Sequence, residues 1–142
     1  MGGTLQVVWA LASLGLPAGG EVTFTRDVAP ILFENCTECH RPGQATPFAL
    51  ITYADARKRA RMLALVTETR LMPPWPPVEG YGEFVGARYL EAQEIATIQA
   101  WAEQGAPEGD PRELPELPTF SDDWKLGTPD MVLEMPQGFE VP

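Results

Sequence analysis

The sequence predicts an all-α domain of three or four helices, followed by an irregular C-terminal extension. Apolar residues recur every three or four positions in three segments, residues 25–35, 53–68 and 90–104, and this spacing is typical of amphipathic helices. Proline and glycine, 15 and 13 of the 142 residues, cluster between residues 72 and 82 and again after 105. These clusters predict long irregular segments, because neither residue suits the interior of a helix.

The N-terminal segment has the features of an export signal rather than of the domain. Residues 5–16 are largely apolar and uncharged, and Pro17 to Gly20 follow them. This is the length of a signal-peptide core and is too short to span a bilayer, although no Lys or Arg precedes it. We therefore expect residues 1–20 to be a signal peptide, residues 21–110 to form the domain, and the mature protein to have no stable membrane span. The alternative is a buried N-terminal helix.

The first predicted helix runs from an N-cap at Thr25 to about residue 35. Pro30 falls early in this helix, where a missing N–H is least harmful. Val28, Ile31 and Leu32 share one apolar face. This face leads directly into the most informative motif of the chain.

Cys36-Thr37-Glu38-Cys39-His40 contains both cysteines and the only histidine of the chain. This CxxCH spacing is that of c-type haem attachment. Two thiols three residues apart on a helical turn can each form a thioether with one vinyl group of the same haem, and the next residue can offer an imidazole nitrogen to the iron. The sequence thus predicts one covalent haem c, bound through Cys36 and Cys39, with His40 as an axial ligand.

The motif has three alternative interpretations. A structural zinc site needs four nitrogen or sulfur ligands, and outside the motif the chain has no further Cys or His. A dithiol redox pair would also use CxxC, but no segment before Cys36 has the pattern of the strand in a βαβ unit. A plain structural disulfide is the third alternative.

The second predicted helix extends from residue 53 to residue 68. Thr52 and Asp55 resemble a capping box at its start, and its inward face contains Ala56, Ala60, Leu63 and Ala64 with Val66 or Thr67. Its exposed side is strongly basic, with Arg57, Lys58, Arg59 and Arg61. Such a cluster is either a solvated face or, alternatively, a docking patch or a contact for haem propionates.

Met72 is the candidate for the second axial ligand. It precedes a segment with four prolines in five residues, 73–77, and these fix the backbone as a stiff extended loop. Such a loop can hold a thioether at a fixed distance from a metal, and no second histidine competes for the position. Met62 is the main alternative, but it lies inside the second predicted helix.

The third predicted helix, residues 90–104, has the clearest pattern. Leu90, Ile95, Ile98 and Trp101 keep one face apolar, Gly105 suits the position after the C-cap, and Pro107 blocks continuation. The glycine-spaced loop before it, residues 78–88, is interpreted as a cover for the haem. The indoles of Trp75 and Trp101 are expected in the core.

Charge is distributed unevenly along the chain. The net charge is −10, and ten of the 20 acidic residues but only two of the ten Lys and Arg lie from Glu103 onward. Such acidity argues against binding to nucleic acid or to an anionic membrane. Residues 111–142 are interpreted as a linker and the truncated start of a following module, because an alternating, strand-like run is cut off at Pro142.

Several stretches together resemble bacterial mono-haem cytochrome c domains over roughly residues 22–111. They are residues 24–32 leading into Cys36–His40, then Arg41-Pro42-Gly43, then Arg70-Leu71-Met72-Pro73-Pro74-Trp75, and finally Trp101 with residues 105–110. The resemblance implies a cytochrome c fold around one haem, with Cys36 and Cys39 at the thioether positions, His40 as the proximal ligand and Met72 as the distal ligand. It also implies export, hence a periplasmic or extracytoplasmic location.

The C-terminal extension carries a second, shorter resemblance. Residues 124–136 look like the junction where such a domain precedes a copper type II, ascorbate-dependent monooxygenase-like module. No copper ligand of that module is present, since the chain has no histidine besides His40. The expected function is therefore electron transfer to or from a partner protein or a C-terminally attached catalytic module. The alternatives are a haem enzyme or gas sensor with an open sixth position, and a haem-free CxxC thiol module.

Overall fold

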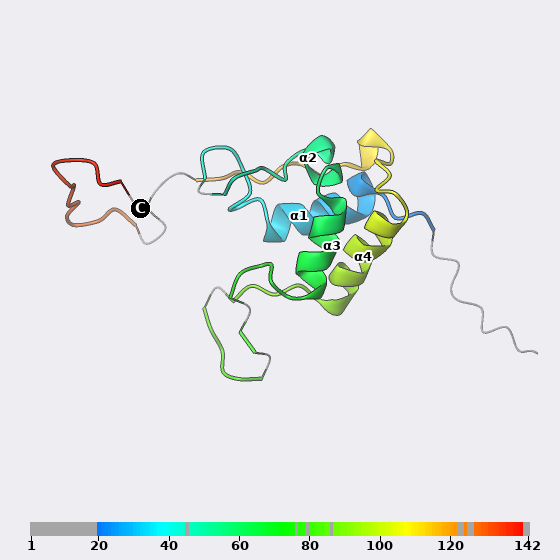
Figure 1. Ribbon diagram of the computed structural model, residues 1–142, viewed down its shortest axis with the longest axis horizontal. Coiled ribbons are helices and arrows are strands. Elements are labelled where there is room, and N and C mark those ends of the chain that lie inside the picture. The colour runs from blue at the N-terminus through cyan, green and yellow to red at the C-terminus, as the bar shows by residue number, and fades with distance from the viewer. Residues whose placement is uncertain are drawn as a thin grey trace, which may run out of the picture.

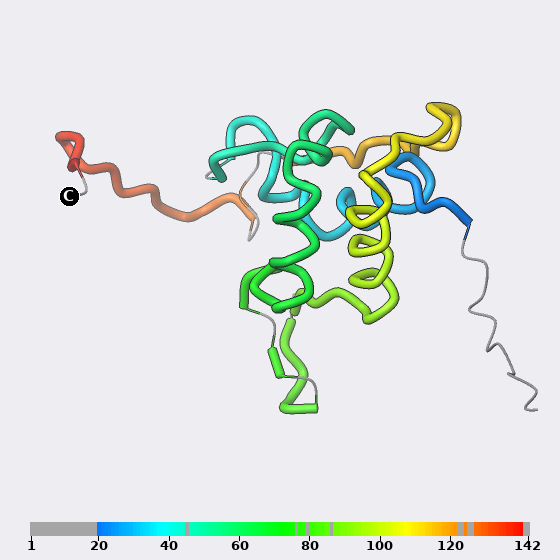
Figure 2. Tube along the Cα trace, turned by 45° about the vertical axis from the view of Figure 1, so that its right-hand side comes forward, coloured from blue at the N-terminus to red at the C-terminus, as the bar shows by residue number. Residues whose placement is uncertain are grey.

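The computed structural model describes residues 20–44, 46–75, 77–78, 80–85, 87–121, 124 and 127–140. In these residues the secondary structure is entirely helical, which confirms the all-α prediction. The α-helices are α1 (Ala29–Asn35), α2 (Tyr53–Arg57), α3 (Ala60–Glu68) and α4 (Ala92–Glu103), with a π-helical turn η1 (Phe24–Val28) and a 3-10 turn η2 (Pro111–Glu113). Figures 1 and 2 show α3 and α4 side by side and antiparallel, with α1 running across them. The predicted signal peptide lies outside the described residues, except for Gly20.

The first helix differs from its prediction at the N-terminus. Helical structure begins at Phe24, so Thr25 is not the N-cap but a buried residue of the first turn. The turn is stabilised by the Asp27 carboxylate, which accepts the backbone N–H of Thr23 at 2.7 Å. Pro30 lies in the first turn of α1, directly after η1.

The prediction of one continuous helix over residues 53–68 is wrong. The Thr52 cap is confirmed, since its hydroxyl accepts the N–H of Asp55 at 3.2 Å, but α2 ends at Arg57 and α3 begins at Ala60. Arg59 leaves helical geometry, with φ −120° and ψ 10°, and its guanidinium stacks over the Phe48 ring at 4.1 Å. The break between α2 and α3 thus coincides with a contact between distant residues, which helical periodicity cannot indicate.

The helix predicted for residues 90–104 is confirmed as α4. The Glu94 carboxylate accepts the N–H of Glu91 at 2.7 Å and so satisfies a free donor at the helix start. Gly105 follows the C-cap with φ +88°. This left-handed conformation ends the helix and is easily adopted by glycine.

Trp101 lies in the core, as the sequence predicts. Its indole is buried and packs at 6.1 Å from the Phe24 ring, and its Nε1–H donates to the Pro107 carbonyl at 2.9 Å. Trp75, in contrast, is 72% exposed, so its predicted place in the core is wrong. The other buried apolar residues are Val28, Ala29, Ile31, Leu32, Phe33, Leu50, Ala56, Ala60, Leu63, Leu90, Ile98 and Ala106.

The segment after α4 joins distant parts of the domain through its backbone carbonyls. Pro107 accepts the N–H of Phe24 at 3.0 Å, and Glu108 accepts the N–H of Thr25 at 2.9 Å. The Tyr53 hydroxyl donates to the Ala106 carbonyl at 2.9 Å. Residues 105–109 thereby tie together the start of the first helix, α2 and α4.

Candidate haem-binding site

The CxxCH motif forms a helical turn at the end of α1, as its spacing predicts. The N–H of Cys36 donates to Leu32 at 2.8 Å, and the N–H of His40 donates to Cys36 at 2.8 Å. Thr37 is the buried residue of the turn, and its hydroxyl donates to the Phe33 carbonyl at 2.7 Å. Because Thr37 points inward, the turn leaves Cys36 half-buried and Cys39 exposed, both as free thiols.

The His40 imidazole is oriented by the segment that follows it. The Phe48 carbonyl lies 3.2 Å from Nδ1, and the two rings are 4.7 Å apart between centroids. A carbonyl only accepts hydrogen bonds, so this contact places the proton on Nδ1 and leaves the lone pair on Nε2. A backbone acceptor of this kind typically fixes the tautomer and orientation of a metal-binding histidine.

The thiols do not have the character of a catalytic redox pair. Burial, with smaller contributions from the Glu94 carboxylate and Cys39, raises the pKa of the Cys36 thiol to about 12. A reactive dithiol needs the opposite shift, because the thiolate is the nucleophile. The environment of Cys36 therefore argues against the thiol-exchange interpretation.

The described part of the chain also provides no zinc site. Within it, no three side chains of His, Cys, Asp or Glu are grouped so that they could hold a metal ion. A structural zinc ion needs four such ligands. Cys36, Cys39 and His40 therefore lack the additional protein donor that the zinc interpretation requires.

Met72 lies outside the attachment turn, on the segment that leaves α3. The N–H groups of Leu71 and Met72 donate to the same carbonyl, that of Val66, at 2.9 and 3.0 Å. The Met72 side chain is 38% exposed and borders a small hollow with Leu90 and Ile95. The structure thus brings Cys36, Cys39 and His40 together in one turn and leaves Met72 on a separate segment.

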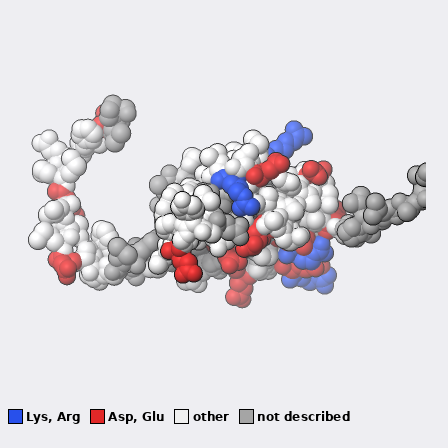
Figure 3. All heavy atoms as spheres, turned by 90° about the horizontal axis from the view of Figure 1, so that it is seen from below, with Lys and Arg blue, Asp and Glu red and all other residues white. Residues whose placement is uncertain are grey.

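The segment between α3 and α4 exposes many apolar side chains. Seen from below, the part of the surface that protrudes there is largely uncharged (Figure 3). An exposed apolar surface of this kind is typical of a site that another group covers. Its exposed large apolar residues are Leu71, Met72, Trp75, Val78, Tyr81, Phe84, Val85 and Tyr89.

Arg88 connects this apolar segment to the attachment turn. Its guanidinium forms an ion pair with the Glu38 carboxylate and lies 3.7 Å from the Cys39 sulfur. Sequence reasoning missed this residue, because a pair separated by 50 positions leaves no local pattern. The attachment turn and the segment between α3 and α4 are therefore joined through Arg88.

Replacing Arg88 with alanine is expected to loosen the segment between α3 and α4. Exposed ion pairs contribute about 0–1 kcal/mol, so backbone amides of residues 77–89 should exchange at most about fivefold faster with solvent. Arg26→Ala is the matched control, because it removes an ion pair with Asp27 elsewhere on the surface. Equal exchange of residues 77–89 in the two variants would show that Arg88 does not hold the segment.

Among the described residues, every helix is too short or too polar to cross a membrane. Comparisons of the chain with protein-family models, with curated proteins and with solved structures found no match. The chemistry of the residues described above is therefore the basis for any functional assignment.

Proposed function

We propose that this chain is a single-electron carrier with a cytochrome c fold around one covalent haem c. Cys36 and Cys39 form the thioethers, and His40 and Met72 are the axial ligands. The observation that supports this proposal best is the orientation of His40 within the CxxCH turn. The Phe48 carbonyl holds the proton on Nδ1, so Nε2 is free to bind a metal.

The residues around the turn fit a large apolar group. The Cys39 thiol is exposed and the Cys36 thiol is half-buried, and large apolar side chains of the segment between α3 and α4 are exposed to solvent. Arg88 keeps that segment close to Cys39. A planar macrocycle attached at Cys36 and Cys39 would bury apolar surface that is otherwise exposed to water, which is favourable at about 25 cal/mol per Å².

Each residue has a distinct part in the proposed mechanism. A bound haem supplies reversible one-electron chemistry at its iron. His40 would offer the Nε2 lone pair to the iron, while the Phe48 carbonyl holds the ring and increases its basicity. The Met72 thioether would supply the second ligand, and a methionine ligand favours the reduced state. Leu90 and Ile95 border a small hollow with Met72 and give this side chain apolar neighbours. An iron that bound both His40 and Met72 would have no position left for a substrate.

The proposal places the protein in an exported compartment, periplasmic or extracytoplasmic. Its electrons would pass to or from a redox partner or a catalytic module attached at the C-terminus. The resemblance of residues 124–136 to the junction before a copper type II, ascorbate-dependent monooxygenase-like module supports the second arrangement. No nucleic acid is expected to bind, because the net charge is −10.

A denaturing gel stained for haem tests the proposal directly. The full chain is expressed together with a c-type maturation system, and a haem-positive band at the mass of the protein is expected, because thioethers survive denaturation. A correctly folded chain without that band would refute the carrier proposal and favour the haem-free CxxC alternative.

Replacing Met72 with alanine is expected to open the sixth coordination position. The oxidised protein should lose the weak near-infrared band of methionine-bound iron, and the reduced protein should bind carbon monoxide readily. Met62→Ala is the control, because Met62 is similarly exposed and was the competing candidate. If the wild-type protein already lacks the band and binds carbon monoxide, Met72 is not a ligand, and the gas-sensor or enzyme alternative is favoured.

A further inference from the structure

We propose that an acidic redox protein docks on a cationic surface formed by Arg57, Lys58, Arg59 and Arg61, and that Phe48 connects this surface to His40. This inference rests on the proposed electron-carrier function. It adds the class of partner and the place where that partner binds.

The cationic surface lies where α2 ends and α3 begins. It contains four of the ten Lys and Arg residues of the chain within five consecutive positions. These side chains border a hollow of about 540 Å³, whose other wall is made by Ala102, Gly105 and Ala106. Because those residues are small, the hollow is open to side chains of another molecule.

The cations of this surface are unpaired, in contrast to others in the domain. Within the described residues, Arg26, Arg88 and Arg112 each form an ion pair with a carboxylate. In the same residues, none of the four cations of the surface has a carboxylate within 4.0 Å. The nearest acidic residue in sequence, Asp55, is engaged as an acceptor of the Thr52 hydroxyl at 2.7 Å.

Unpaired cations around a hollow favour a partner with carboxylates at matching positions. Such charges guide encounter and set specificity more than they add affinity. A nucleic acid or an anionic membrane would also carry negative charge, but the rest of this acidic chain would repel an extended polyanion. A compact protein with a local acidic patch is the partner that this arrangement fits.

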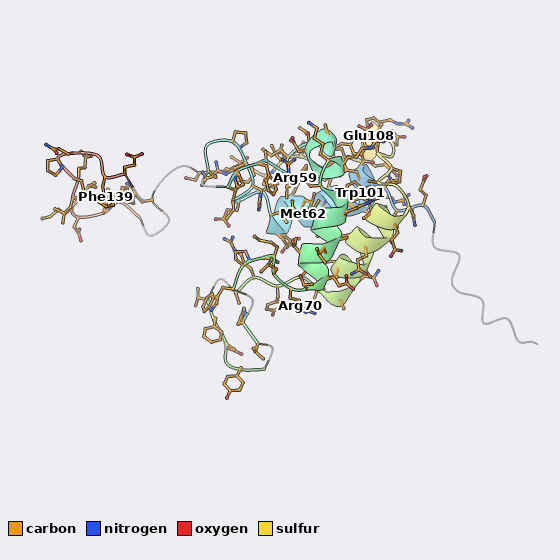
Figure 4. The ribbon with its side chains drawn as sticks, in the orientation of Figure 1. Arg59, Met62, Arg70, Trp101, Glu108 and Phe139 are labelled. Carbon is orange, nitrogen blue, oxygen red and sulfur yellow. The ribbon has the colours of Figure 1, made fainter. Side chains whose placement is uncertain are left out.

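Arg59 places the cationic surface next to the proposed haem ligand. In Figure 4 it lies where α2 meets α3, on the side of the segment that follows His40. Its guanidinium is 4.1 Å from the Phe48 ring, which is 4.7 Å from the His40 ring. A partner in contact with Arg59 is thus separated from His40 by two stacked side chains, those of Arg59 and Phe48. One electron would pass between the iron and the redox centre of the partner, with no bond made or broken.

Rates of oxidation by small charged reagents test the surface in the haem-loaded chain. Reversing three exposed charges, in an Arg57→Glu, Lys58→Glu, Arg61→Glu variant, should slow oxidation by the anion ferricyanide about tenfold at low salt. It should accelerate oxidation by the cation tris(phenanthroline)cobalt(III), and added salt should reduce both effects. Lys58→Glu and Arg112→Glu serve as matched controls, because each reverses one charge, the first within the cationic surface and the second outside it. Equal effects of these two substitutions would show that only net charge matters and would overturn the inference.

Binding supplies a readout that is independent of electron transfer. A short poly-L-glutamate peptide, small enough to contact the cationic surface without extending over the acidic remainder of the chain, is titrated into the reduced, haem-loaded chain while backbone amide shifts are recorded. Shifts centred on residues 57–61 and 105–106, absent from the triple variant, are expected. Shifts elsewhere, or shifts that persist in the triple variant, would overturn the docking site.

The connection through Phe48 is tested separately by Phe48→Leu, which removes the ring but keeps the backbone carbonyl. Oxidation by ferricyanide should slow severalfold, while haem content and poly-L-glutamate binding stay unchanged. Phe139→Leu is the control, since Phe139 is exposed in the C-terminal extension and lies away from Arg59 (Figure 4). An unchanged rate in Phe48→Leu would overturn the connection. A chain without any haem would instead refute the proposed function, and poly-L-glutamate binding would still decide the docking site.

Discussion

A Cys36→Ala, Cys39→Ala double variant is expected to lose all covalently bound haem. Each thiol would form one of the two thioethers, so no covalent bond to the macrocycle can remain when both sulfurs are removed. The haem stain at the mass of the protein on a denaturing gel should therefore disappear completely. This is the largest change expected from any substitution in the chain.

Two controls separate attachment from folding. Met72→Ala removes a proposed iron ligand but neither sulfur, so its gel band should keep the haem stain. Far-ultraviolet circular dichroism should show that the double variant still forms helices, because Cys39 is exposed and Cys36 only half-buried. A double variant that keeps the stain would mean that haem is bound through other residues, and the proposed site would be wrong.

Gly109→Ala is expected to cause the largest loss of stability. Gly109 has φ +90°, and a Cβ placed there would lie 2.5 Å from the Thr25 hydroxyl oxygen and 2.6 Å from the Thr23 Cβ. Left-handed backbone costs an L-residue roughly 1–2 kcal/mol, and overpacking adds about 1–3 kcal/mol. The free energy of unfolding in urea should therefore fall by about 2–5 kcal/mol.

Gly43→Ala separates the two contributions. Gly43 also has a left-handed backbone, with φ +83°, but a Cβ there would meet no atom within 4 Å. This variant should lose only the conformational part, roughly 1–2 kcal/mol. Equal losses in the two variants would show that the close approach of Gly109 to residues 23–25 contributes nothing.

The features that the sequence predicted correctly are those set by neighbours along the chain. Helical periodicity located α1, α3 and α4, and the Thr52 cap and Gly105 depend on residues within one turn. The CxxCH turn belongs to the same class, because the hydrogen bonds of the Cys36 and His40 N–H groups join residues four positions apart. The haem itself, and Met72 as its second ligand, remain predictions.

The features that sequence reasoning missed depend on contacts between distant segments. The break at Arg59 coincides with stacking on Phe48, and the Arg88–Glu38 ion pair spans two loops. Trp75, which was expected in the core together with Trp101, is exposed in a segment that contains several prolines. None of these contacts produces a periodic pattern, so the sequence alone could not indicate them.

The hydrogen bond that orients His40 comes from the main chain of Phe48, so side-chain mutagenesis cannot remove it. Substituting residue 48 changes the ring beside the imidazole but leaves the acceptor in place. An alanine scan would therefore register Phe48 as a packing residue and overlook its carbonyl. Only a change to the backbone, such as an ester in place of the amide after residue 48, would weaken this acceptor. The Phe48 carbonyl oxygen, which orients His40, is therefore retained in every side-chain variant of residue 48.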